Sequence, residues 1–104
     1  TGVDEDKMHQ LLPTFALQQN SPNPVNPTTT IPYQVPVESK VSIKIYDIRG
    51  QEIINLFDGD QSAGHHELRW SGLNKDGQAM STGVYFCRFM SGNFQHTIKM
   101  LYLR

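Results

Sequence analysis

Residues 41–50 read Val-Ser-Ile-Lys-Ile-Tyr-Asp-Ile-Arg-Gly, and this stretch indicates the fold class. Aliphatic and polar residues alternate over its first half, which predicts a β-strand with one buried face. Asp47 to Gly50 then predicts a tight turn, in which Gly50 adopts a positive φ. Residues 51–57 would return as the antiparallel partner. The stretch therefore predicts a β-hairpin at the centre of the chain.

The same pattern of short strands and turns continues on both sides of this hairpin. Asp58-Gly59-Asp60 and Asn74 to Gly77 predict further turns, and Ser91-Gly92-Asn93 predicts a hairpin loop. Turn signals recur every 8–12 residues or so and no segment has a helical period. We predict an all-β fold, a seven-stranded antiparallel immunoglobulin-like or fibronectin type III-like β-sandwich. The expected strands are 15–17, 29–35, 41–46, 51–57, 65–70, 84–90 and 94–103.

Alternate residues of a strand point to the same face, so the apolar positions of each expected strand indicate which side chains lie in the core. We expect the most buried residues to include Val41, Ile43, Ile45, Leu68, Trp70, Tyr85 and Cys87. Tyr85 is also a candidate for a tyrosine corner. Pro32 lies inside the expected second strand, and proline cannot donate to a ladder, so we expect that strand at or near a sheet edge.

Residues 19–31 contain three prolines, Pro22, Pro24 and Pro27, directly before a β-branched run. Proline fixes φ and disfavours the helical region for the residue before it. We expect a stiff, extended, polyproline-like ribbon on the surface. The ribbon has no acid, base or phosphate-binding glycine, so it suits docking better than chemistry.

Composition bounds the class of protein. A chain of 104 residues with 38% hydrophobic residues is one folded domain. Its net charge of −1 gives no argument for nucleic acid, and no apolar run is long enough for a transmembrane helix. No acid follows Asp76, whereas Arg88, Lys99 and Arg104 do. This uneven distribution of charge has two explanations. It arises by chance in a short chain, or the basic C-terminal end meets an acidic receptor.

Chemistry-bearing clusters are missing from the sequence pattern. His65 and His66 are adjacent, so in a strand they point to opposite faces and do not chelate one metal. Cys87 is the single cysteine and lies in a strand centre, where a buried thiol is expected. The Asp- and Asn-containing turns have too few ligands for a calcium loop. We expect no enzyme activity, no metal and no cofactor. Trp70 belongs to the core or, alternatively, to a sugar-binding platform.

Five blocks in order resemble the type A C-terminal sorting domains of the type IX (Por) secretion system. They are the opening at residues 22–31, Val41 to Ile53, Ser62 to Gly72, Gly77 to Phe86, and Lys99 to Arg104. The middle part is also similar to the immunoglobulin-like domain of flagellar hook-capping proteins. The resemblance covers residues 15–104. It assigns motif positions to Gly50, Gly64, Trp70, Gly72, Gly77, Gly83 and Tyr85.

The resemblance implies a secretion and sorting signal read by the type IX translocon and commonly removed by a sortase. The protein would reach the cell surface or the medium of a Gram-negative bacterium through the periplasm and outer membrane. Residues 1–14 would be a linker or disordered segment, and the missing signal peptide suggests a cargo domain upstream in the precursor. The expected recognition residues are Pro22, Asn23, Pro24, Asn26, Pro27, Lys99 and Arg104.

Two other functions remain open at this point. One is an accessory carbohydrate-binding module of a secreted enzyme, which would need exposed aromatic residues. The other is a structural spacer domain, like the hook-capping domain that the middle of the chain resembles.

Overall fold

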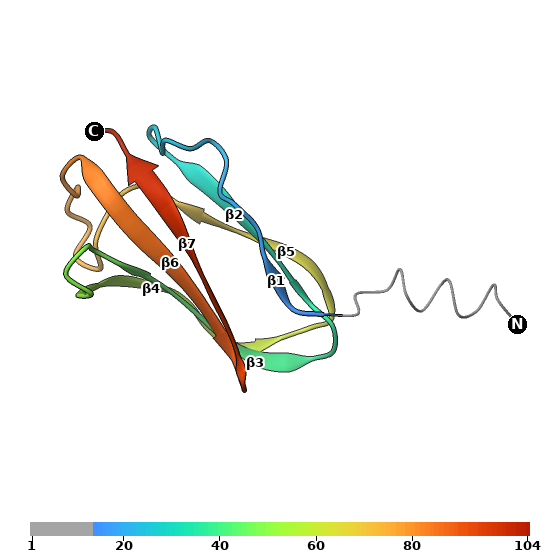
Figure 1. Cartoon of the computed structure of the whole chain (residues 1–104). Coiled ribbons are helices and arrows are strands. Elements are labelled where there is room, and N and C mark those ends of the chain that lie inside the picture. Colours follow the sequence, from blue (N-terminus) through green and yellow to red (C-terminus); the bar gives the residue numbers. More distant parts are fainter. Residues whose placement is uncertain (1–13) are drawn as a thin grey trace, which may run out of the picture.

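The computed structural model describes residues 14–104 of the chain; the prediction of an N-terminal linker falls almost entirely on residues outside that range. The described part forms two β-sheets packed face to face (Figure 1). One sheet has the order β1–β2–β5 and the other β4–β3–β6–β7. The strands are β1 (Ala16–Leu17), β2 (Thr29–Val35), β3 (Ser39–Tyr46), β4 (Glu52–Gln61), β5 (Gly64–Trp70), β6 (Gly83–Ser91) and β7 (Phe94–Tyr102).

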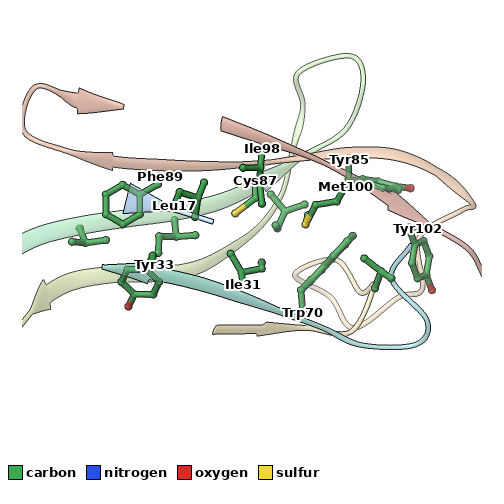
Figure 2. Packing of buried hydrophobic residues seen from close by; sticks show 14 of the residues in the cluster. Leu17, Ile31, Tyr33, Trp70, Tyr85, Cys87, Phe89, Ile98, Met100 and Tyr102 are labelled. Atoms are coloured by element: carbon green, nitrogen blue, oxygen red, sulfur yellow. The ribbon is translucent and has the colours of Figure 1, made fainter. Parts of the chain in front are cut away.

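The predicted seven-stranded antiparallel sandwich is confirmed, and its core fills the space between the sheets (Figure 2). Alternate residues of β3 and β6 point inward, as their sequence period requires. Each fully buried aliphatic side chain contributes about 1.5–3 kcal/mol, so these strands are the main source of stability. Fully buried residues include Val41, Ile43, Ile45, Cys87 and Phe89 from this sheet and Ile31 from the other.

Leu68 departs from its prediction, because it is only half-buried. Its side chain has the expected inward parity, shared with His66 and Trp70. However, β5 is the outermost strand of its sheet and has β2 as its only neighbour. Sequence period selects the face of a strand but does not reveal whether a second strand covers its flank.

We expected β2 at or near a sheet edge at Pro32; β2 is instead the central strand of its sheet, although its neighbour β1 ends opposite Tyr33, one residue from Pro32. The sheet accommodates Pro32 because the backbone nitrogen and carbonyl of this residue face β1 and not β5. Its carbonyl accepts a hydrogen bond of 3.0 Å from the Gln18 amide, on the β1 side. In an antiparallel ladder the nitrogen and carbonyl of one residue face the same neighbour. The missing N–H of Pro32 therefore faces the point where β1 ends at Leu17, and the ladder to β5 stays complete.

The predicted turn at Asp58-Gly59-Asp60 is also wrong, because these residues continue β4. Gly59 pairs with Val41, and its neighbours pair with Lys40 and Ser42 of β3. Pairing along the whole of β3 overrides the local turn preference of an Asp-Gly-Asp sequence. The chain reverses later, at Ser62 and Ala63, before β5 begins.

Strand directions bring several connections to one end of the sandwich, which we call the C-terminal end. It holds the segment 18–28, the turn 47–51, the loop 71–82 and the end of β7, whereas the described chain begins at the opposite end (Figure 1). Residues 14–104 include no helix with the length and apolar character needed to span a membrane.

Candidate functional site

The segment 18–28, which joins β1 to β2, leaves its own sheet and runs along the edge of β7. The Val25 amide donates a 2.6 Å hydrogen bond to the Leu101 carbonyl, and the Leu103 amide donates to the Val25 carbonyl at 3.3 Å. The Leu101 amide donates to Asn23 Oδ1 at 3.0 Å, and Gln19 Nε2 donates to the Lys99 carbonyl at 2.9 Å. The segment therefore satisfies the outer edge of β7 and ties the two sheets together.

This arrangement corrects the expectation of a stiff, extended, polyproline-like ribbon on the surface. The segment bends at residues 22–24 and again at 26–27, and Val25 between the bends forms a parallel bridge to Tyr102. Val25 has an exposed fraction of 0%. It turns inward because its backbone pairs with β7 and its side chain then faces the core. Val25 is therefore the buried apolar anchor of the segment.

A buried polar network holds the first bend in place. Asn20 Nδ2 donates to Thr29 Oγ1 at 3.0 Å, and Thr29 Oγ1 donates to the Pro22 carbonyl at 2.8 Å. Both side chains are buried. Buried polar groups must be hydrogen-bonded, so this network fixes the conformation of residues 20–22 relative to β2. Sequence reasoning missed Asn20 and Thr29, because nothing in either position signals a partner nine residues away.

The structure brings the two groups of predicted recognition residues together at the C-terminal end. The pairing of Asn23 with Leu101 and of Val25 with Leu103 places the bends beside the end of the chain. The Arg104 amide in turn donates to Thr82 Oγ1 at 2.9 Å, which holds the last residue on the loop 71–82. We call this group the composite surface; all of its members are exposed: Pro22, Asn23, Pro24, Asn26, Pro27, Lys99 and Arg104.

An aromatic cluster of Trp70, Tyr85 and Tyr102 packs in the core at the end where β7 finishes (Figure 2). The ring centroids of Trp70 and Tyr85 are 5.5 Å apart, and those of Trp70 and Tyr102 are 5.7 Å apart. Trp70 Nε1 donates to the Leu73 carbonyl at 2.9 Å. The Tyr85 hydroxyl donates to the Ser81 carbonyl at 2.7 Å, four residues upstream, which confirms the predicted tyrosine corner.

Trp70 is 2% exposed, so it belongs to the core and does not form a sugar platform. The predicted glycine positions lie in turns or at strand ends. Gly50, Gly64 and Gly77 have positive φ in turns or at a strand start, and Gly83 begins β6. Gly72, with φ of +75°, packs directly against the ring of Tyr102.

The turn 47–51 lies at the same end of the sandwich as the loop 71–82 and is closed by one carboxylate. Asp47 Oδ1 accepts from the amides of Gln51 and Arg49, both at 2.9 Å. The hydrogen bond from the Gln51 amide is the main reason why the pKa of Asp47 lies below its ordinary value. The amide and the charge of Arg49 lower this pKa further. An open hollow of about 630 Å³ separates this turn from the loop 71–82, with Glu52, Lys75 and Met80 in its walls. No sequence pattern signals this hollow beyond its two turns.

The side chains considered for chemistry lie apart from one another. His65 is exposed and His66 is half-buried, stacked on Tyr33 with ring centroids 5.3 Å apart, so the two point to opposite faces as expected. Burial raises the pKa of the Cys87 thiol to about 12, which keeps it protonated. Within residues 14–104 no three His, Cys, Asp or Glu side chains gather as a metal-binding group.

Fold and strand order define the class of the protein: it is an immunoglobulin-like β-sandwich domain. The family model described as the FlgD Ig-like domain matches residues 26–89, more than half of the chain. The chain therefore belongs to this family. No curated protein matches the sequence.

Solved structures share the fold at low sequence identity. PorU of Porphyromonas gingivalis, described as dimeric and latent, matches 88% of this chain with a TM-score of 0.65 and 20% identity. PorZ of the same organism, described as an essential surface component of its type IX secretion system, matches 86% with a TM-score of 0.56 and 20% identity. FlgD of P. aeruginosa matches 84% with a TM-score of 0.59 and 22% identity.

The matched region is a small part of the two Porphyromonas proteins. It covers 10% of PorU and 12% of PorZ, against 67% of the FlgD chain. This chain therefore spans about a tenth of the length of the larger proteins that share its fold.

Proposed function

We propose that this domain is a C-terminal secretion and sorting signal of a larger exported protein. In this proposal a type IX translocon recognises the folded domain, and a sortase removes or processes it while the cargo is attached to the cell surface or released. The cargo would lie upstream in the same precursor. The domain is then a substrate of the secretion machinery and not an enzyme, and its route runs through the periplasm and outer membrane.

One observation carries the proposal. The two segments that resemble the opening and closing motifs of the sorting domains are far apart in sequence, yet they form one exposed surface. Asn23 and Val25 bond directly to Leu101, so the Pro-containing bends and the last strand present themselves together. A receptor that binds both segments at once can therefore bind only the folded domain. The shared fold with PorZ, a protein described as part of a type IX secretion system, supports the same reading.

The charge of the composite surface supports an acidic receptor. Lys99 and Arg104 are exposed, and neither forms an ion pair with any residue between 14 and 104. Charged residues at the rim of an interface mainly raise the rate of encounter with a complementary surface. We therefore expect their removal to slow export without unfolding the domain.

Export of a reporter tests the proposal. The domain is fused to the C-terminus of a reporter with a signal peptide, in a host with a type IX system, and the reporter outside the cell is measured over time. We expect export by the intact domain, and slower export by Lys99→Gln and by Lys99→Gln/Arg104→Gln. Lys40→Gln is the matched control, because Lys40 is an exposed lysine at the opposite end of β3. Thermal unfolding of each variant verifies the fold.

Truncation gives the harsher test. Deleting residues 99–104 removes the buried Met100 and Tyr102 along with the edge that pairs with Val25, so we expect the fusion to remain in the periplasm. Export of this truncated domain at the rate of the intact one would overturn the proposal. So would failure of the intact domain to export the reporter at all.

A spacer role is the second candidate, favoured by one observation. The described chain enters at one end of the sandwich and the C-terminus lies at the other, which suits a module that holds neighbouring parts of a chain apart (Figure 1). A spacer would leave the fused reporter in the periplasm, so the same experiment separates the two functions.

A further inference from the structure

Three of the four outer sheet edges are closed. Strand β1 is two residues long, and the segment 18–28 covers β7 through Val25. Strand β4 carries two register shifts against β3, and the Lys75 amide donates to the Ile53 carbonyl on its outer side at 3.1 Å. Short strands, bulges and covering loops are the usual means by which proteins prevent edge-to-edge pairing.

Strand β5 has none of these protections. It pairs with β2 over seven residues in one continuous register and contains no proline. Thr30 exchanges hydrogen bonds with Ser21, on the β1 side, so its neighbours Thr29 and Ile31 face β5. By the alternation of an antiparallel ladder, the amides and carbonyls of His65, Glu67 and Arg69 point away from β2. Those groups have no backbone partner among residues 14–104.

The flank beside this edge is incompletely buried. Leu68 faces the core but stays half-buried, because no strand lies on its outer side. In constant-type immunoglobulin domains the corresponding sheet has a fourth strand, whereas here β4 belongs to the opposite sheet. An added strand at β5 would take that free position.

We propose that β5 pairs with β5 of a second copy of this chain, antiparallel and about a two-fold axis at Leu68. Glu67 of each copy then lies opposite Arg69 of the other, and Leu68 lies opposite Leu68 at about 4.5 Å between α-carbons, the spacing of a non-hydrogen-bonded pair. The two sheets join into one continuous sheet. This inference does not depend on the sorting function.

The charges of Glu67 and Arg69 favour a second copy of the chain as the partner of β5 and favour one register of pairing. Opposite charges directly across two strands stabilise the pairing, and like charges destabilise it. The two-fold axis repeats the Glu67–Arg69 pair, so both copies contribute the same favourable contact. A shift of the axis to residue 67 would place Glu67 opposite Glu67. Both side chains are exposed, and neither forms an ion pair with another residue of the described range. The edge is thus complementary to itself in one register.

Sedimentation equilibrium of the full chain tests the proposal at concentrations up to about 1 mM, since so small an interface gives weak association. We expect a monomer–dimer equilibrium. Glu67→Arg and Arg69→Glu each replace two attractive pairs by two repulsive ones, so each weakens dimerisation about tenfold. The double variant Glu67→Arg/Arg69→Glu restores the pairs and the dimer.

Glu38→Arg is the matched control for Glu67→Arg, because Glu38 is exposed in the turn before β3 and its substitution makes the same change in net charge. We expect it to leave the dimer unchanged, and thermal unfolding to verify the fold of every variant. A monomeric wild type would overturn the proposal. Occupation of the β5 edge by residues 1–13 of the same chain, or by another protein, would leave the wild type monomeric in this way. A dimer that ignores either charge reversal, or that the double variant fails to restore, would overturn it equally.

Discussion

Gly72 lies against the ring of Tyr102 so closely that the chain has no room for a β-carbon at position 72. A β-carbon there would be 2.5 Å from Cζ and 2.7 Å from the hydroxyl oxygen of Tyr102, and it would also meet Cε1. Tyr102 ends β7, and Gly72 follows β5 in the other sheet. The contact therefore joins the two sheets directly below the composite surface.

Gly72→Ala should lower the free energy of unfolding by about 2–5 kcal/mol, the sum of a left-handed backbone cost and the displacement of Tyr102. Gly77→Ala is the control, because Gly77 has φ of +78° and nothing within 4 Å of the built β-carbon. It should cost only about 1–2 kcal/mol. Chemical denaturation measures both. Equal losses would show that the Tyr102 contact carries no cost.

Trp70→Ala should cost about 3–5 kcal/mol, because it empties a large space in the core and breaks the contacts with Tyr85 and Tyr102. Ile48→Ala should change stability by less than about 0.5 kcal/mol, since Ile48 is an exposed turn residue. Thermal or denaturant unfolding gives both values. A small loss at Trp70 would contradict its place in the core.

Val25→Ala should cost about 2–3 kcal/mol, from the lost burial of two carbons and the cavity that remains. The same change at Val37, which is exposed in the turn before β3, should have almost no effect. If the two substitutions behaved alike in urea unfolding, Val25 would not be the anchor of the segment 18–28.

Asn23→Ala should speed hydrogen exchange of the Leu101 amide about two- to tenfold, because it removes the side-chain acceptor of that amide. Asn26→Ala should leave the exchange rate unchanged, since the Asn26 side chain has no hydrogen bond to any residue from 14 to 104. Amide exchange followed by NMR measures both. An unchanged rate in Asn23→Ala would mean that the segment does not protect the edge of β7.

Cys87 should be unreactive toward thiol reagents at pH 8 in the native protein and reactive after unfolding. Desolvation raises its pKa to about 12 from the ordinary value of 9.0, so the fold favours the neutral thiol. The free energy of unfolding should therefore be unaffected by this group below pH 9 and should fall as the pH rises from 9.0 toward 12. Cys87→Ala should remove that decline. Rapid native labelling at pH 8 would contradict the burial of the thiol.

The sequence predicted those features that depend on neighbouring residues. Alternation at Val41, Ile43 and Ile45 identified a strand and its buried face, and Asp47 to Gly50 identified the turn that follows. The spacing of turn signals identified seven strands and the sandwich class. The tyrosine corner was also foreseen, because its hydrogen bond spans only four residues.

The candidate site was predicted as two separate groups of residues, at Pro22–Pro27 and at Lys99–Arg104. The hydrogen bonds of Asn23 and Val25 to Leu101 could not be predicted, because no local pattern relates residues 78 and 76 positions apart. Asn20 and Thr29 were missed because their hydrogen bond depends on how the chain bends between them, which no periodic pattern encodes.

Period-2 alternation and turn chemistry are local, so the amino-acid sequence by itself determined the strands, their inward faces and the all-β class. Strand order is a long-range property, and only the tertiary structure decided it. It placed β2 in the centre despite Pro32, extended β4 through Gly59 and left Leu68 on an uncovered flank. The tertiary structure also placed Val25 in the core. The backbone groups at the outer edge of β7 need hydrogen-bond partners, and folding brings the distant Val25 to that edge.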